Sequence, residues 1–402
     1  MIKRKITGAL KHLRFAIVFF LILLSIFPVY NPCFTPTTKI TESVPLFAAS
    51  IQIYGNAQLN FTASSGNGTQ LNPYVIENLT INGMGSPCIW ISTTTAFFIL
   101  QYNLLFNGTG IQLDNVKNGI MRNNTFNATG WGIDVSESEN ILIYENNLTE
   151  NQRGIHIQGS NDTIISHNNV TSSTDQSKGI HIDGGNNVTL LNNHIYTRTW
   201  GVSFSEGIGA ILNNVIVSQG TSLDLYKTNN SIISNNTILN GDEGVYLAGC
   251  NNNTFFNNTV AQNGYGIYMT DQYGLSNENR FITNNISNNV RGIYMLLANA
   301  TTVDGNQINH NRYQGLYMQN SNYTTITNNQ FLDNGWGYIW EGSTIYEGPN
   351  CYFTVYENNT IVDKWSFLGG QGGAEWWWGL LIGGIVLGCV VIYFYVKRKR
   401  SP

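Results

Sequence analysis

A short repeat, with a period near 22 residues, constrains this 402-residue chain more than any other feature of its sequence. Each copy begins with an alternation of apolar and polar residues that usually opens with glycine. The first residues of the twelve copies are Cys88, Gly110, Gly132, Gly154, Gly179, Gly201, Ser222, Gly244, Gly266, Gly292, Gly315 and Gly337. A unit this short cannot bury a core of its own, so the copies must stack on one another.

Each copy contains two or three short segments with the alternation of period two that is typical of β-strands, joined by turns rich in Asn, Gly and Ser. We therefore predict an all-β fold, a right-handed parallel β-helix of about 12 to 13 coils over residues 51–367, with no helix inside it. Leucine-rich repeats share the period but need a leucine-rich consensus that is missing here, and a propeller needs a longer period.

One asparagine of each copy falls in the same turn, which predicts an asparagine ladder along the stack. Stacked side-chain amides can hydrogen-bond to backbone groups and to the next amide, and asparagine tolerates left-handed backbone angles. The predicted ladder consists of Asn103, Asn124, Asn146, Asn168, Asn193, Asn214, Asn236, Asn258, Asn284, Asn306, Asn329 and Asn359.

Both ends of the chain indicate membrane topology. Residues 1–30 combine five basic residues with an apolar run and predict a signal peptide or signal anchor, and residues 31–50 form a linker and the start of an N-terminal cap. A glycine-rich linker, 368–375, precedes 21 nearly uninterrupted apolar residues, 376–396, which predict a transmembrane helix with a basic tail, 397–402. The positive-inside rule places both basic ends in the cytoplasm and the β-helix outside the cell membrane.

Charge and motifs exclude several functions. Residues 15–396 hold 11 basic and 24 acidic residues, a net charge of −13. We predict no nucleic-acid partner, because phosphate contacts need a basic surface. The chain has none of the usual nucleotide-binding, zinc-protease or serine-hydrolase motifs. Its 18 N-x-[ST] sequons are compatible with a glycosylated outer surface.

The run NPYVIENLTI at residues 72–81, followed by repeated G-I-x-I and I-x-x-N-N-x-[IVF] units, resembles the NosD-like family of right-handed β-helix repeats. This family overlaps with repeats called carbohydrate-binding and sugar-hydrolysis domains, and the resemblance covers residues 51–367. It implies an extracytoplasmic protein that handles copper, as the name-giving group does, or that binds, lyses or hydrolyses polysaccharides. It supplies no catalytic motif that can be placed on residues of this chain.

The middle residue of each G-I-x-I unit points away from the core, so these residues form an outward column along one face. The column reads Trp90, Gln112, Asp134, His156, His181, Ser203, Asp224, Tyr246, Tyr268, Tyr294, Tyr317 and Ile339. The four consecutive tyrosines predict an exposed aromatic strip on which apolar sugar faces can stack. The alternative is an aromatic ladder that stabilises the strands and binds nothing.

Earlier in the same column, three consecutive copies supply ligands that suit a divalent metal such as copper, zinc or calcium. These metal candidates are Asp134, His156 and His181. A solvated polar column and an acid–base site are the alternatives. A lyase would need Arg153 or Lys178 as its base, and a hydrolase would need paired carboxylates, for which Asp114 and Asp134 are candidates.

We therefore expect a membrane-anchored, extracytoplasmic surface protein that binds a glycan or a partner protein through the tyrosines and performs no catalysis, with the lipid bilayer as a further partner. The alternatives are a metal-handling accessory protein of the NosD type and a polysaccharide lyase or hydrolase. Two insertions, after Val170 and after Met269, lie beside the histidines and the tyrosines. Extra loops on a regular repeat are often functional.

Overall fold

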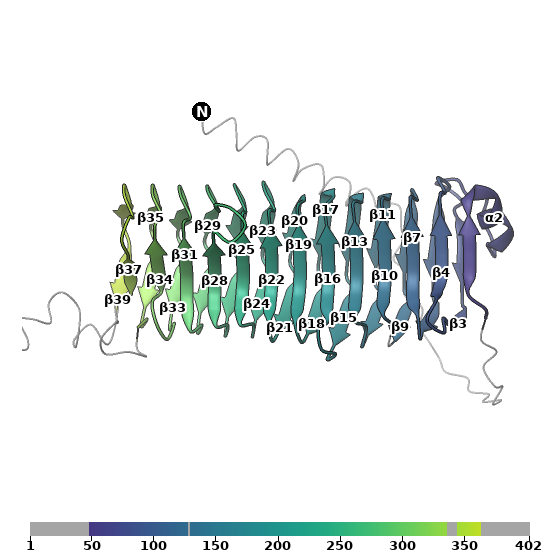
Figure 1. Cartoon of the computed structure of the whole chain (residues 1–402), viewed down its shortest axis with the longest axis horizontal. Coiled ribbons are helices and arrows are strands. Elements are labelled where there is room, and N and C mark those ends of the chain that lie inside the picture. The colour runs from purple at the N-terminus through teal and green to yellow at the C-terminus, as the bar shows by residue number, and fades with distance from the viewer. Residues whose placement is uncertain (1–47, 128, 336–343, 363–402) are drawn as a thin grey trace, which may run out of the picture. The chain divides into compact units, whose positions relative to one another are not determined.

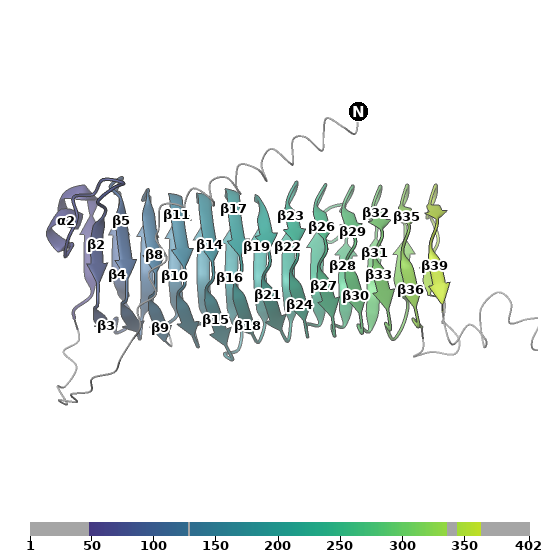
Figure 2. The same cartoon turned by 180° about the vertical axis from the view of Figure 1, so that it is seen from behind.

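A computed structural model describes residues 48–127, 129–335 and 344–362 of the chain. Its strands form three parallel sheets of 13 strands each, seen from opposite sides in Figures 1 and 2. The chain visits the three sheets in turn, so each strand pairs with its counterpart one coil away. The predicted parallel β-helix is therefore confirmed, with 13 coils between Ile51 and Val362.

The three sheets are named by the order in which the chain enters them. The first sheet contains β1 (Ile51–Tyr54), β4 (Pro87–Ser92), β7 (Thr109–Asp114), β10 (Trp131–Ser136), β13 (Arg153–Gln158), β16 (Lys178–Asp183), β19 (Trp200–Ser205), β22 (Thr221–Tyr226), β25 (Glu243–Ala248), β28 (Tyr265–Thr270), β31 (Arg291–Leu296), β34 (Leu316–Gln319) and β37 (Ile345–Glu347). The second contains β2 (Tyr74–Glu77), β5 (Phe98–Gln101), β8 (Gly119–Arg122), β11 (Glu139–Tyr144), β14 (Asn161–Ser166), β17 (Asn186–Leu191), β20 (Ile208–Leu212), β23 (Ile232–Ser234), β26 (Thr254–Phe256), β29 (Arg280–Ile282), β32 (Thr302–Asp304), β35 (Thr325–Thr327) and β38 (Val355–Glu357). The third contains β3 (Thr80–Asn82), β6 (Leu104–Phe106), β9 (Thr125–Asn127), β12 (Asn147–Thr149), β15 (Asn169–Ser172), β18 (His194–Thr197), β21 (Val215–Ser218), β24 (Thr237–Leu239), β27 (Thr259–Ala261), β30 (Asn285–Ser287), β33 (Gln307–Asn309), β36 (Gln330–Leu332) and β39 (Thr360–Val362).

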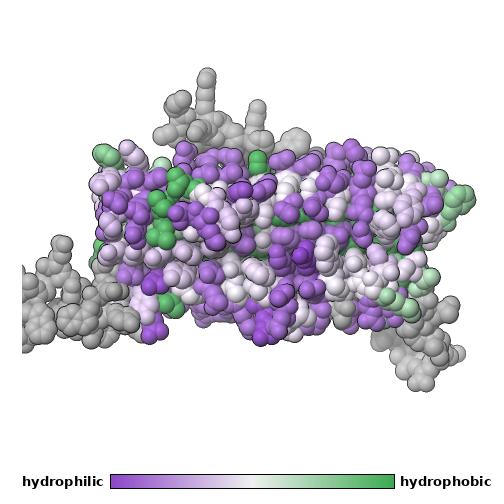
Figure 3. Space-filling model, in the orientation of Figure 1, coloured by the Kyte–Doolittle hydropathy of each residue, from purple (hydrophilic) through white to green (hydrophobic). Residues whose placement is uncertain are grey.

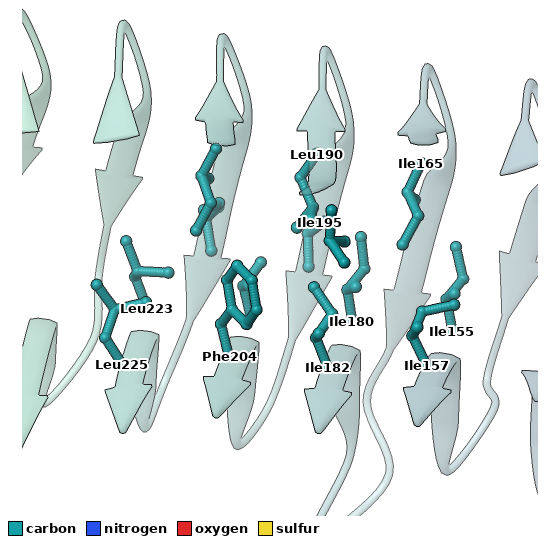
Figure 4. Packing of buried hydrophobic residues seen from close by; sticks show 14 of the residues in the cluster. Ile155, Ile157, Ile165, Ile180, Ile182, Leu190, Ile195, Phe204, Leu223 and Leu225 are labelled. Carbon is teal, nitrogen blue, oxygen red and sulfur yellow. The ribbon is translucent and has the colours of Figure 1, made fainter. Parts of the chain in front are cut away.

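One continuous apolar core fills the coils, and the surface seen in Figure 3 is mainly hydrophilic. Equivalent inward residues of neighbouring coils stack in register, as Ile155 of β13 does on Ile180 of β16 (Figure 4). The glycine that opens most repeats leaves room for this close stacking. A Cβ atom at Gly132 would lie 2.6 Å from the carbonyl oxygen of Gly154 in the next coil. The repeated glycine is therefore needed there because the backbones approach closely.

The predicted asparagine ladder runs along the turn between the second and third sheets. In the middle of the stack, Nδ2 of Asn214 donates to Oδ1 of Asn236 at 3.0 Å, and the backbone N–H of Asn214 donates to the same oxygen at 2.9 Å. Nδ2 of Asn214 also donates to two backbone carbonyls, those of Leu190 and Leu212. Amide-to-amide bonds of 2.9 to 3.1 Å join every neighbouring pair of the twelve predicted residues.

The left-handed backbone angles lie one residue before the ladder and not at the ladder asparagines, which differs from the expectation. Asn213 and His167, for example, each have a φ of 55° and directly precede a ladder asparagine. The preceding residue thus turns the chain, and the buried amide then holds the turn closed. Other residue types occupy this position as well, since Glu145 also has a φ of 55° there.

A second asparagine ladder, which the sequence analysis did not single out, occupies the turn between the third and first sheets. Nδ2 of Asn263 donates to Oδ1 of Asn289 at 3.0 Å, Asn289 donates likewise to Asn311 at 3.1 Å, and Asn311 to Asn334 at 2.9 Å. Each of these residues follows a residue of the predicted ladder by five positions. That constant offset is the sequence signal that identifies the second ladder.

One short helix, α2 (Gly55–Thr62), follows β1, so the expectation that residues 51–367 contain no helix is wrong. The helix packs on β1 and β2, and Leu59 inserts fully buried into the core. It covers the first coil as the expected N-terminal cap would. A helix of eight residues with a single buried side chain leaves no periodic pattern long enough to detect.

The last coil is longer than the others, and this displaces one residue of the outward column. Tyr317 pairs with Tyr346 of β37, so Tyr346, and not Ile339, continues the column. The ladder shows the same extension, because Asn329 and Asn359 are 30 residues apart. The G-Y-I-W sequence that starts at Gly337 imitates the start of a repeat, but it lies outside the described residues.

The predicted signal segment 1–30, the linker 368–375, the transmembrane segment 376–396 and the tail 397–402 also lie outside the described residues. In the part of the chain that the structure describes, no helix is both long and apolar enough to cross a membrane.

Replacing a ladder asparagine in the middle of the stack will destabilise the fold strongly. The Asn214→Ala variant should lower the free energy of unfolding by about 3 kcal/mol. Buried backbone groups on its own and the preceding coil lose their partners, and so does the side-chain amide of Asn236 on the following coil. The control is Asn147→Ala, whose side chain is exposed and which should cost less than about 0.5 kcal/mol. Urea unfolding followed by circular dichroism measures both. Equal losses for the two variants would show that the ladder contributes no special stability.

Candidate functional site

The outward face of the first sheet carries the candidate site. Strand pairing places the predicted column in register, with Asp134 beside His156 and His156 beside His181. Further along the same column, pairing also aligns Tyr246, Tyr268, Tyr294, Tyr317 and Tyr346 on five consecutive coils. We call these five residues the tyrosine strip.

The rings of the tyrosine strip contact one another along the stack. Tyr294 and Tyr317 are stacked, with ring centroids 4.3 Å apart and an interplanar angle of 9°, and Tyr346 stacks on Tyr317 at 4.8 Å and 13°. Tyr268 meets Tyr246 and Tyr294 edge to face, at 5.6 and 5.5 Å. Tyr346 is 40% exposed, and the other four are partly exposed. The strip is a continuous aromatic surface that solvent can reach.

Two further residues widen the tyrosine strip. Tyr265 stacks on Tyr268, with centroids 4.9 Å apart, and its hydroxyl accepts a hydrogen bond of 2.8 Å from Nη1 of Arg291. The Arg291 guanidinium also lies within 5.6 Å of the ring centre of Tyr294. The sequence analysis did not single out Arg291. Its position directly before the glycine of its repeat was the available signal.

The hydroxyl groups of Tyr246 and Tyr294 remain protonated near neutral pH. Burial, followed by nearby negative charge and neighbouring tyrosines, raises the pKa of Tyr246 to about 12, and burial likewise raises the pKa of Tyr294 to about 12. Tyr246 Oη donates to Oε1 of Gln272 at 2.8 Å, and Gln272 belongs to the insertion after Met269. The predicted proximity of this insertion to the tyrosines is therefore observed. The oxygen of such a neutral phenol can still accept a hydrogen bond from a ligand.

The three metal candidates lie together, but two of them are paired with each other. Nδ1 of His156 and Oδ1 of Asp134 are 2.8 Å apart, and both residues are buried. The ring of His181 stacks on that of His156 with centroids 5.2 Å apart and an interplanar angle of 12°. Nδ1 of His181 is buried and has no hydrogen-bond partner.

Burial is the largest cause that lowers the pKa of His181 to about 3, and the positive charges of Lys178 and Arg153 and the neighbouring His156 add to it. His181 is consequently neutral at physiological pH. The field at this point of the surface disfavours an added positive charge.

This arrangement does not fit a transition-metal site. Asp134 already engages one nitrogen of His156, and the nearly parallel rings of His156 and His181 aim their nitrogen lone pairs into separate planes. The cations that lower the pKa of His181 would also repel a metal ion. In the part of the chain that the structure describes, no group of three or more His, Cys, Asp or Glu side chains is arranged to hold a metal.

The carboxylates considered for hydrolysis are engaged as well. Oδ2 of Asp114 accepts hydrogen bonds from the Trp90 indole at 2.6 Å and from the Gln112 amide at 3.0 Å. Asp134 accepts from His156. In each carboxylate, neighbouring side chains hold one oxygen.

The fold and the aromatic outer face together define a right-handed parallel β-helix protein. The sequence profile described as "Right handed beta helix region" matches residues 221–379, and the profile described as "Periplasmic copper-binding protein (NosD)" matches residues 49–214. The chain belongs to the NosD-like family of right-handed β-helix repeat proteins. No curated protein matches its sequence significantly.

Two solved structures with this fold are similar to the chain. The A-module of mannuronan C-5 epimerase AlgE4 from Azotobacter vinelandii is similar with a TM-score of 0.50 and 12% identity, over 77% of this chain and 96% of that one. The Dettilon tailspike protein is similar with a TM-score of 0.52 and 15% identity, over 67% of this chain and 62% of that one. At these identities the likeness shows the fold alone.

The neutral His181 predicts a specific pH dependence of stability. The unfolded chain binds a proton near pH 6.5, whereas the folded chain binds it only near pH 3, so the contribution of His181 is lost as the pH falls through that window. The free energy of unfolding of the native chain should therefore fall more steeply between pH 7 and pH 4 than that of His181→Gln. Urea unfolding across this range measures it.

The control for this pH dependence is His194→Gln, which removes an exposed histidine of β18. Its pH profile should run parallel to that of the native chain. If the His181→Gln profile also runs parallel, the pKa of His181 is not lowered.

Proposed function

We propose that this chain is a membrane-anchored, extracytoplasmic β-helix protein that binds a glycan along the tyrosine strip and performs no catalysis. The observation that carries the proposal is the alignment of five tyrosine rings on consecutive coils of one sheet. Tyr317 is stacked between Tyr294 and Tyr346, so the strip presents mainly its partly exposed ring edges as apolar surface to a sugar. The hydroxyl oxygens can accept hydrogen bonds from the sugar. A repeating surface suits a repeating ligand, and a glycan chain is such a ligand.

The structural comparison agrees with a carbohydrate ligand at the level of the fold. A protein named as a mannuronan epimerase has this fold, so the fold is compatible with a polysaccharide substrate. A partner protein is the alternative occupant of the same strip. The copper binding in the name of the matching family profile receives no support from the geometry of Asp134, His156 and His181.

The proposal places the β-helix outside the cell and ties it to the bilayer through residues 376–396. The support is 21 apolar residues followed directly by four cations. Full-length protein should stay with the membrane fraction during a high-salt wash and dissolve only in detergent, and deletion of residues 376–402 should weaken this association. Release of the full-length chain by salt alone would contradict the anchor.

Removing aromatic surface from the strip should weaken glycan binding. The double variant Tyr268→Ala and Tyr294→Ala should lose affinity by about tenfold or more, because two stacking surfaces disappear. The matched variant with Phe at both positions keeps the rings and should keep most of the affinity. A glycan array followed by calorimetric titration of the best oligosaccharide measures both.

The control for the strip is Tyr196→Ala, which removes a tyrosine of β18 in the third sheet that is 60% exposed. It should bind like the native chain. Equal affinity of the native chain and the double alanine variant would refute glycan binding at the strip. New reducing or unsaturated sugar ends in the same incubations would show that the protein is a hydrolase or lyase.

A further inference from the structure

Two cations lie side by side on the same sheet face as the tyrosine strip. Arg153 and Lys178 are the first residues of β13 and β16, and they are direct partners in the strand register. The Arg153 guanidinium lies 4.7 Å from the ring centre of Trp131, and Nζ of Lys178 lies 5.2 Å from the ring centre of Trp200. Four consecutive coils thus present Trp131, Arg153, Lys178 and Trp200, and we call this group the cation clamp.

The cations of the clamp have no anionic partner in the part of the chain that the structure describes. Other cations there do form ion pairs, for example Lys117 with Glu139 and Lys227 with Glu206. Among the described residues, neither Arg153 nor Lys178 forms an ion pair or a side-chain hydrogen bond. Like charges opposite each other on paired strands are destabilising. The tryptophan faces hold both cations in place, while their N–H groups remain available to a ligand.

The local field at the clamp is positive, although the chain as a whole is acidic. Lys178 and Arg153 both help to lower the pKa of His181, which stands beside them on the same face. The nearest acids weaken this field only in part. Asp134 is bonded to His156, and the negative charges of Asp224 and Asp183 act on Lys178. The exposed carboxylate of Asp183 is the remaining negative charge on β16.

We propose that the cation clamp binds the carboxylate of an acidic sugar unit, so that the glycan bound by this protein is a polyuronate. This inference rests on the proposed function. A guanidinium presents parallel N–H groups that match the two oxygens of a carboxylate, and the ammonium of Lys178 adds a second charge. The flanking tryptophans offer faces on which neighbouring sugar rings can pack.

The clamp and the tyrosine strip lie on one continuous sheet face. β16 is separated from β25, the first strand of the strip, by β19 and β22. Three steps at the strand spacing place the two groups about 14 Å apart along the stack. An extended polymer that lies along the stack contacts both, with its charge at the clamp and its apolar ring faces at the tyrosines.

Calorimetric titration of the full-length protein in detergent tests this proposal with three oligosaccharides of equal length. The ligands are an oligogalacturonate, a neutral oligosaccharide and a sulfated one. We expect the oligogalacturonate to bind most tightly and its affinity to fall with added salt. Arg153→Gln combined with Lys178→Gln should lower that affinity by about tenfold or more, and should change the affinity for the neutral ligand by less than about twofold.

Two variants separate the clamp from general effects. Lys117→Gln combined with Arg198→Gln removes the same net charge from cations that already have carboxylate partners, and should leave binding unchanged. Arg153→Lys keeps the charge but not the paired N–H groups, so it should lose part of the affinity for the oligogalacturonate. This single variant should keep the fold, so it still tests the clamp if the double variant does not fold.

The outcomes distinguish the clamp from the proposed function. Loss of oligogalacturonate binding in the tyrosine variants, with none in the clamp variants, would overturn the clamp and keep the strip. The opposite pattern would support the clamp and overturn the strip. Tighter binding of the neutral ligand, or of the sulfated one, would overturn the assignment of a carboxylate.

Discussion

The pairing of each strand with its counterpart one coil away is the constraint on which the rest of this structure depends. It brings equivalent residues of successive repeats into direct contact, and the buried amides hold them there. Asn214 illustrates how, because its one side chain ties its own coil to both neighbouring coils through four hydrogen bonds. A coil of about 22 residues has no core of its own, so this coupling between coils replaces the closed core of a globular domain.

The same pairing makes each face of the stack a set of columns. Inside, a column of isoleucines packs without change of register from β13 to β16. Outside, the register forces side chains that repel one another, such as Arg153 and Lys178, to be neighbours if the sequence places them at the same point of the repeat. Such a pair is destabilising unless something else compensates it. An outward column of residues that repel one another, or of one residue type, is therefore a good candidate for a binding site.

The sequence predicts the fold well because the repeat period and the alternation leave few alternatives, and the ladder asparagines mark the same turn in every coil. It predicts less where a coil departs from the repeat. Leu59 of α2 is a single buried residue without periodicity, and Tyr346 was missed because Gly337 begins a segment that imitates the repeat. The alternation also says which side of a strand a residue faces, but not whether it is solvated. Asp134 and His156 face outward and are nevertheless buried, and the ring of Trp131 packs edge to face against His156.

The site at Asp134, His156 and His181 shows why residue type and proximity do not suffice to identify a metal centre. A metal needs lone pairs that converge and a field that tolerates positive charge. Here the carboxylate holds one imidazole, the second imidazole is stacked parallel to the first, and two cations flank them. The same flanking cations that disfavour a metal favour an anion. The net charge of −13 over residues 15–396 would suggest the reverse. The arrangement of a few charges on one sheet face, and not the total charge, therefore decides which ligand that face attracts.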